Sequence, residues 1–273
     1  MIRELIDLAV SFVLFGALAQ VRPCNPGQRR FLTREFADNI LYWGFGLLVY
    51  GDLVTTYIRS GAGLLFQQGA PAITAKILAG YGPAAALPLW LQAVLILFGL
   101  DFLQYWLHRL LHEKTLWPFH AVHHSAEELD WSSTYRIHPI NFMLYGAGAL
   151  ALIRVIGFSP IAFAVLIPFN LVIGPLVHAN LDWTFGPFRY VIASPVFHRW
   201  HHVKDPAFRD KNFAPTFPVL DLMFGTFYMP KGVLPQGFGV DDAPRHFLGQ
   251  MVYPFRAMLE RVGQPGKAGQ SVA

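Results

Sequence analysis

The sequence predicts an all-α fold: an integral membrane helical bundle with a helical cap on its cytoplasmic side. Hydrophobic residues make up 54% of the 273 residues and charged residues only 14%, against about 25% charged residues in soluble domains. Apolar stretches close to the ~20 residues that cross a bilayer also recur along the chain. These two observations favour a bilayer as the solvent, and about four to five membrane spans.

The predicted spans can be taken in order. The apolar stretches are residues 5–20, 40–57, 87–107, 140–156 and 161–177. Glu4 and Asp7 interrupt the pattern of a secretory signal, so we expect the first stretch to be retained. Residues 61–82 are broken by Gly and Pro and fit a re-entrant or interfacial segment. Between the last two spans, Gly157-Phe158-Ser159-Pro160 predicts a tight helical hairpin, because Gly suits a helix C-cap, Ser an N-cap and Pro the first turn.

Basic residues predict the orientation and exclude one class of partner. They lie between the first two spans, occupy the loop after the third and recur in the tail, so these parts should face the cytoplasm. They form no continuous stripe, so nucleic acid is not an expected partner despite the net charge of +4. We expect a bacterial inner-membrane protein.

We expect three regions: N-terminal membrane segments (1–84), a catalytic region (85–230) and a C-terminal tail with a disordered end (231–273). Cys24 is the one cysteine, which excludes a disulfide framework or a Cys-ligated cluster within a single chain. Any metal must therefore be held by histidine and carboxylate.

Eight of the eleven histidines fall in three short patterns: His108-Arg-Leu-Leu-His112, His120-Ala-Val-His123-His124 and His198-Arg-Trp-His201-His202. Residues four apart share a helix face, so His108 and His112 should point at one site. In the other two patterns we expect the i, i+3 pair to share a site and the adjacent histidine, turned by about 100°, to face a neighbouring one. This geometry predicts two metals side by side.

The spacing does not choose the metal, since imidazole suits iron, zinc, copper and nickel. A zinc-dependent membrane hydrolase stays an alternative, although Arg109 stands where metalloproteases place their Glu. A histidine-rich metal transporter is another, although the patterns lie at segment ends rather than at mid-membrane.

Residues 101–228 resemble the fatty acid hydroxylase and sterol desaturase superfamily of membrane di-iron enzymes. The resemblance rests on the three histidine patterns with Asp101, Arg136-Ile-His138-Pro139, His178-Ala-Asn180, Lys211-Asn212-Phe213 and Asp221-Leu-Met-Phe224-Gly225-Thr226-Phe227-Tyr228. It implies two iron ions, O2 as co-substrate, and hydroxylation or desaturation of a lipid such as a sterol-like isoprenoid or a fatty acyl chain. The last motif carries no metal ligand and is expected to pack the cap.

The resemblance also implies a ligand set. The implied ligands are His108, His112, His120, His123, His124, His178, His198, His201 and His202. Gly174 stands where some relatives have a further histidine, and His138 is a candidate to fill that position.

Two other polar residues are candidate catalytic residues. Asp101 lies two helical turns before His108, where it could orient an imidazole through its free N–H. Asn180 could be a weak ligand or bind an iron-bound water, or simply cap a segment.

The electrons for such a reaction should come from a separate ferredoxin or cytochrome-type donor with its reductase. The sequence holds no haem-binding segment, cysteine cluster or nucleotide fingerprint. Basic residues near the third pattern could dock an acidic carrier, or contact anionic lipid. They are Arg189, Arg199, Lys204, Arg209 and Lys211.

Overall fold

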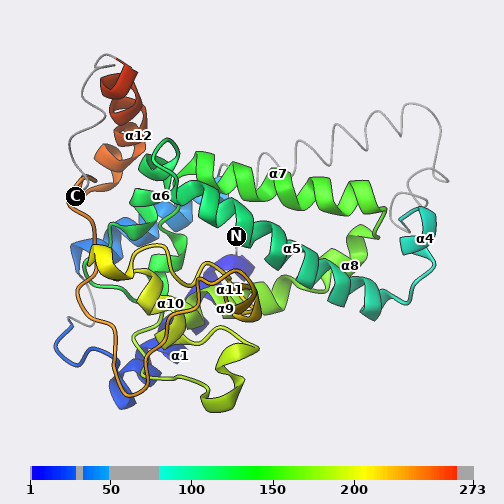
Figure 1. Ribbon diagram of the computed structural model, residues 1–273, viewed down its shortest axis with the longest axis horizontal. Coiled ribbons are helices and arrows are strands. Elements are labelled where there is room, and N and C mark those ends of the chain that lie inside the picture. Colours follow the sequence, from blue (N-terminus) through cyan, green and yellow to red (C-terminus); the bar gives the residue numbers. More distant parts are fainter. Residues whose placement is uncertain (1, 29–32, 49–79, 263–273) are drawn as a thin grey trace.

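The computed structural model describes residues 2–28, 33–48 and 80–262, and these residues form an all-helical structure (Figure 1). Within these ranges the β-structure is limited to one isolated antiparallel bridge between Val203 and Phe238. The predicted fold class is confirmed.

Elements of the membrane part and elements of the cap alternate along the chain. The membrane part contains α1 (Ile2–Val21), α4 (Gly82–Ala85), α5 (Leu89–His112), α7 (Pro139–Ile156), α8 (Pro160–Ala164) and α9 (Ile167–His178). The cap contains α6 (Trp117–His124), η1 (Trp131–Tyr135), η2 (Gly186–Tyr190), α10 (Pro195–His201), η3 (Pro206–Phe208), α11 (Val219–Met223) and α12 (Phe247–Val262). Residues 34–48 are helical as well.

Within the described residues, three helical stretches are long and apolar enough to cross a membrane: Leu89–His112, Pro139–Ile156 and Pro160–His178. They match the third, fourth and fifth predicted spans, as expected for an integral membrane protein. The first prediction corresponds to α1, whose apolar part, Leu5–Val21, is shorter. The end of the second prediction and most of residues 61–82 lie outside the described residues. Large apolar side chains such as Trp90 and Val155 are exposed on these helices, which suits contact with lipid.

The predicted helical hairpin is confirmed. Gly157 caps α7 in the left-handed region with φ 86°, and the Ser159 hydroxyl accepts from the Ile161 N–H at 3.1 Å at the start of α8. The Gly157 carbonyl also accepts from the Tyr81 N–H at 2.8 Å. A Cβ on Gly157 would meet the Tyr81 backbone, so both the cap conformation and this close approach require glycine.

Two apolar cores lie at opposite ends of α5. One joins α5, α7 and α8 around Ile96, Ile153 and Phe158. The other lies in the cap around Phe197 and Trp200 of α10. Figure 1 shows α6 and α10 at the C-terminal end of α5 and α4 at its N-terminal end. The histidine-bearing elements therefore gather where the membrane helices meet the cap.

Candidate metal centre

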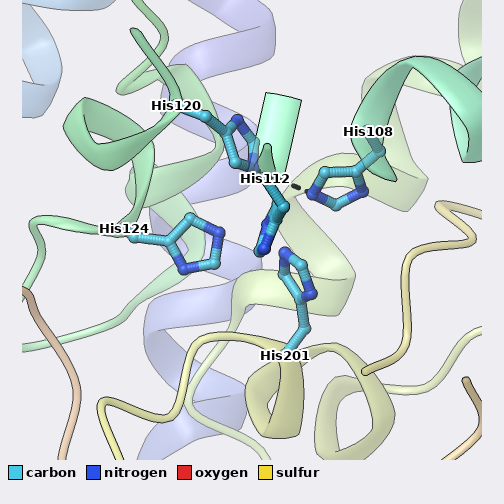
Figure 2. A group of neighbouring side chains, drawn as sticks. All are labelled: His108, His112, His120, His124 and His201. Atoms are coloured by element: carbon cyan, nitrogen blue, oxygen red, sulfur yellow. Dashed lines mark hydrogen bonds between the residues drawn. The ribbon is translucent and has the colours of Figure 1, made fainter. Parts of the chain in front are cut away.

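Nine histidines form two groups, and within each group one ligand atom per residue lies within 4.8 Å of all the others. The five-histidine group contains His108, His112, His120, His124 and His201 (Figure 2). The four-histidine group contains His123, His178, His198 and His202. Eight of the nine are buried and His112 is half-buried. The structure thus brings together the eight histidines of the sequence patterns and His178.

The division between the groups corrects the expected pairing. On α6, His120 and His124 join the five-histidine group while His123 belongs to the other. In the third pattern, His198 and His202 share a group and His201 crosses over. The i, i+4 pairs therefore share a site, because residue i+4 is turned by only about 40° from residue i, against about 60° for i+3.

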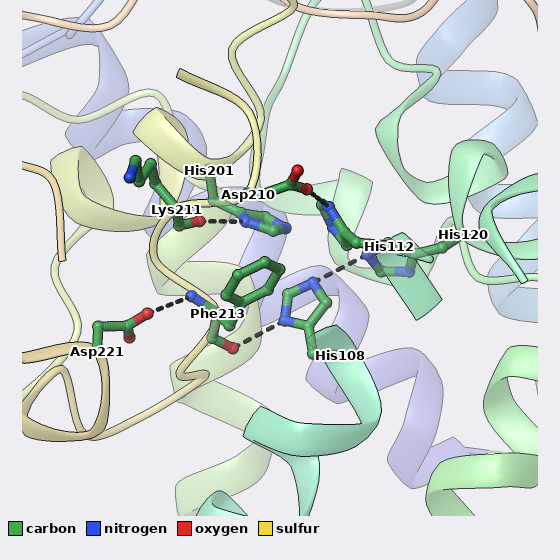
Figure 3. Close-up of polar contacts among 8 residues, drawn as sticks. All are labelled: His108, His112, His120, His201, Asp210, Lys211, Phe213 and Asp221. Carbon is green, nitrogen blue, oxygen red and sulfur yellow. Dashed lines mark hydrogen bonds and ion pairs between the residues drawn. The ribbon is translucent and has the colours of Figure 1, made fainter. Parts of the chain in front are cut away.

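The five-histidine group is oriented by a short segment of backbone, residues 210–213, which we call the 210–213 strap (Figure 3). His108 Nδ1 lies 2.8 Å from the Phe213 carbonyl oxygen and His201 Nδ1 lies 2.7 Å from that of Lys211. His112 Nδ1 lies 2.8 Å from Asp210 Oδ1. Because carbonyls and carboxylates only accept, each Nδ1 carries the proton and each Nε2 presents a lone pair to the group.

Local chemistry holds the 210–213 strap in place. Asp210 and Asn212 have φ values of 62° and 58°, a conformation that Asp and Asn tolerate better than other L-residues. The Asn212 amide donates to the Phe197 and Tyr228 carbonyls at 2.8 and 2.7 Å. Asp221 Oδ1 accepts from the Phe213 N–H at 2.7 Å. These contacts fix the direction of the accepting oxygens.

The four-histidine group is instead oriented by two backbone carbonyls, one in α9 and one just after η1. His178 Nδ1 lies 2.8 Å from the Gly174 carbonyl oxygen and His123 Nδ1 lies 3.2 Å from that of Arg136. Their Nε2 atoms, both in the lone-pair form, face each other at 3.2 Å. His198 Nε2 lies 3.1 Å from the Nε2 atoms of both His178 and His202.

Both groups fit a bound cation. Facing lone pairs repel one another unless a positive charge lies between them. In the five-histidine group, Nε2 of His112, His124 and His201 is buried with no hydrogen-bond partner among the described residues, although buried polar atoms are normally satisfied. Burial also lowers the pKa of His120, His123 and His124 well below its usual range. These imidazoles are therefore neutral at pH 7 and free to bind metal.

A small cavity connects the groups to the surface. It has a volume of about 10 Å³ and touches His112, His124 and His201 of one group and His202 of the other. Trp117 and Arg209 also line it, and the Arg209 guanidinium lies 5.3 Å from the centre of the Trp117 ring. This volume is about the size of one water molecule, so the space between the groups admits only a very small ligand.

Three expected site residues lie elsewhere. His138 caps α7: its Nδ1 accepts from the Ile140 N–H at 3.2 Å, and its Nε2 lies 3.2 Å from the Met251 carbonyl oxygen. Both nitrogens are engaged, so the structure does not place His138 in a metal group. Asn180 is paired with the backbone of Asn25 at 2.8 and 3.1 Å, a contact that ties the cap to the segment after α1.

Asp101 contacts no histidine in the described part of the chain. Its Oδ2 accepts from the Phe217 N–H at 2.9 Å. Two helical turns separate Asp101 from His108, about 10.5 Å along the axis, so a shared face does not bring the side chains into contact.

Arg199 was expected in a basic docking face, but it is fully buried and cannot belong to a surface. Its guanidinium donates to the carbonyls of Leu129 and His178 at 2.6 and 3.2 Å and to the Asn25 side chain. Arg199 is a fixed part of the cap, because it satisfies backbone carbonyls that flank the four-histidine group.

Four polar residues near the histidines were not predicted as site residues. Asp210, Asn212 and Asp221 shape the 210–213 strap, and Asn141 on α7 lies 3.1 Å from His120 Nδ1 through its amide. Asn141 Oδ1 is buried and unpaired in the described structure, so the flipped amide, in which Oδ1 accepts from His120 Nδ1, satisfies both atoms better. Asn141 and His120 are 21 residues apart in the sequence, so no local spacing pattern predicts their contact.

The comparison with known families identifies the domain that contains this arrangement. Residues 93–226 match the family model described as fatty acid hydroxylase, and this range contains all nine grouped histidines. Residues 93–226 form a fatty acid hydroxylase domain. The predicted resemblance is confirmed.

Relatives of this chain include enzymes that act on lipids. Ornithine lipid hydroxylase from Rhizobium tropici is 33% identical over 184 residues, which are 66% of this chain and 56% of the relative. Alkylglycerol monooxygenase from Xenopus tropicalis is 35% identical over 142 residues, 50% of this chain and 30% of the relative. Very-long-chain aldehyde decarbonylase from Oryza sativa subsp. japonica is 32% identical over 146 residues, 49% of this chain and 22% of the relative.

The matches therefore span between about a fifth and just over half of the length of these relatives. No solved structure was found to match the chain.

Proposed function

We propose that the chain is a membrane di-iron oxygenase that hydroxylates a C–H bond of a lipid. The reaction consumes one O2, two electrons and two protons, inserts one oxygen atom into the C–H bond and releases the other as water. Desaturation of the same lipid, which removes two hydrogens and releases two waters, is the neighbouring reaction of this chemistry.

One observation carries the proposal: two adjacent sets of imidazoles, with five Nδ1 atoms held by outward acceptors so that Nε2 faces inward. A pair of metal sites with nitrogen ligands and little carboxylate suits iron and redox chemistry better than a single tetrahedral zinc, which needs only four ligands. Two bound irons would supply the capacity to activate O2. The family assignment and the lipid hydroxylases among the relatives support the same reaction.

The chain's own residues would orient the ligands and exclude water. The 210–213 strap and the backbone of α9 hold the imidazoles in one tautomer. The cap core around Phe197 and Trp200 shields the four-histidine group. A dry site suits the oxidation of an unactivated C–H bond, because it prevents side reactions with solvent.

The membrane and the electron donor are part of the proposal. We propose that the histidine groups face the cytoplasm of a bacterial inner membrane. A separate ferredoxin or cytochrome-type protein, with its reductase, would deliver the electrons. Arg189, Lys204, Arg209 and Lys211 remain as a docking face after Arg199 is removed from it.

Oxygen-isotope labelling tests the reaction. The iron-loaded protein in lipid nanodiscs would be incubated with a total bacterial lipid extract, a ferredoxin, its reductase and 18O2, and the products analysed by mass spectrometry. The proposal predicts a lipid heavier by one 18O, formed only with oxygen and reductant, and absent in His201→Ala.

The alternatives give other results. A zinc-loaded protein that converts lipid without O2, with label entering only from H2 18O, would contradict the oxygenase and favour the hydrolase. Metal uptake into sealed vesicles, without lipid conversion, would favour the transporter.

A further inference from the structure

A second, larger cavity lies inside the membrane bundle. It has a volume of about 280 Å³, is open on one side, and is lined by residues of α5, α7, α8, α9 and the loop before α11. Apolar side chains such as Leu97 and Phe163 form part of its wall. Its remaining wall is unusually polar for a membrane interior, with Asp101, Gln104, Asn170 and Thr216. Polar side chains in such a position are costly and normally mark a functional site.

The cavity lies close to both histidine groups. Gln104 is one helical turn before His108 on α5, and Asn170 is one turn before Gly174, whose carbonyl faces His178. Phe142 directly follows Asn141, the partner of His120. One turn of helix rises about 5.4 Å, so a chain in this cavity comes within roughly one turn of His108 along α5 and two turns of His178 along α9.

Asp101 has an unused acceptor in the cavity wall. The residue is 2% exposed, and its Oδ2 is taken by the Phe217 N–H. Its Oδ1 is buried with no hydrogen-bond partner of ordinary geometry among the residues that the structure describes, although the Thr216 hydroxyl lies beside the carboxyl. A buried carboxylate oxygen without a partner is unfavourable, so the wall calls for a donor from inside the cavity.

We propose that the cavity binds a lipid chain that carries a hydrogen-bond donor, a hydroxyl or an amide N–H, and that Asp101 Oδ1 accepts from it. This inference rests on the proposed lipid oxidation and names its substrate class. Asp101 would then determine specificity by holding the donor-bearing part of the lipid beside α5, two helical turns before His108. A plain hydrocarbon or an ether, which has no donor, would leave Oδ1 unpaired.

Binding of two matched probes tests the proposal. Tritiated hexadecan-1-ol bound to the iron-loaded protein in nanodiscs would be displaced by unlabelled hexadecan-1-ol or by hexadecyl methyl ether, which differ in the donor. The wild type should favour the alcohol by about fivefold, the effect of one hydrogen bond.

The variant Asp101→Asn sharpens the test, because the asparagine side chain has nearly the same shape as the aspartate side chain but carries an N–H₂ donor. Its amide oxygen can accept from the Phe217 N–H, which turns the amide N–H₂ into the cavity. The variant should therefore lose the preference for the alcohol or reverse it in favour of the ether. Asp182→Asn, which changes a carboxylate paired with Arg22 outside the cavity, should keep the wild-type ratio.

Two outcomes would overturn the proposal. Equal binding of alcohol and ether by the wild type would mean that water satisfies Asp101. An alcohol preference that persists in Asp101→Asn would mean that another group recognises the donor. Iron content and 18O incorporation, measured on the same preparations, separate this failure from failure of the oxygenase function, because probe binding needs neither oxygen nor electrons.

Discussion

The two histidine groups differ in what holds them. The five-histidine group depends on the 210–213 strap, which is buried at Asn212 and Phe213 but reaches the surface at Asp210, whose side chain is 59% exposed. The four-histidine group is fully buried, and its outer contacts are the backbone carbonyls of Gly174 in α9 and of Arg136 just after η1. The first group is therefore adjustable from the surface, while the second is fixed by the fold. Metal in the five-histidine group should be the more exchangeable of the two.

The largest effect on iron content should come from substituting two adjacent histidines, His201 and His202, which belong to different groups. His201→Ala removes a ligand from the five-histidine group and His202→Ala removes one from the four-histidine group. Each variant should retain about one of two irons and lose lipid oxidation, and the double variant should retain neither iron. Elemental analysis of purified protein measures this. Loss of both irons from either single variant would show that the groups form one site.

The stability of the protein should fall in acid, because both groups contain buried histidines with lowered pKa values. Burial lowers the pKa of six histidines in the cap, His120, His123, His124, His198, His201 and His202. Below a pH of about 6.5 the unfolded chain takes up protons that the folded chain does not, so stability falls with falling pH. Asp221, whose pKa burial raises to about 6, and Asp130, whose pKa burial also raises, oppose this trend with two protons against six.

For the metal-free protein in detergent, we therefore expect the midpoint of thermal unfolding to be level between pH 8 and 7 and to fall steadily from pH 6.5 to 5. Circular dichroism measures the midpoint. A midpoint that stays constant down to pH 5 would contradict the neutral, buried imidazoles.

Asp210→Asn separates the groups more finely. The hydrogen bond from His112 lowers the pKa of Asp210, so this carboxylate is charged at pH 7 and can raise the basicity of His112. The variant should weaken iron binding in the five-histidine group by about 10- to 100-fold. Competition with a coloured iron chelator should show one iron released faster and the other unchanged. If Asp210→Asn released both irons faster by the same factor, Asp210 would not act on the five-histidine group alone.

The sequence predicted the membrane helices and the metal-bearing histidines better than it predicted what orients them. Apolar length and the Gly157–Pro160 caps are local signals, and they located α5, α7 and the α8–α9 hairpin. The three histidine patterns supplied eight of the nine grouped residues, and the family resemblance supplied His178.

The outer contacts depend on tertiary structure. Asp210 and Asn212 act through left-handed backbone conformations that their residue types permit but do not dictate. Asp101 shares a helix face with His108 but lies too far along the axis to touch it. Arg199 looked like its basic neighbours, yet the fold buries it, because the carbonyls of Leu129 and His178 need a donor there.

The smallest effect should come from Asn141, which contacts His120 of the five-histidine group. Asn141→Leu removes the acceptor for His120 Nδ1, so we expect about tenfold weaker iron binding in that group. Asn141→Asp keeps an acceptor at the same place and should restore binding, as measured by the same chelator competition. If both variants bind iron as the wild type does, Asn141 does not orient His120.

The most direct test of two separate metal sites is an X-ray structure with anomalous data collected on both sides of the iron edge. The account predicts two iron peaks per chain, one among His108, His112, His120, His124 and His201, and one among His123, His178, His198 and His202. A single peak, or two peaks that scatter as zinc, would contradict it.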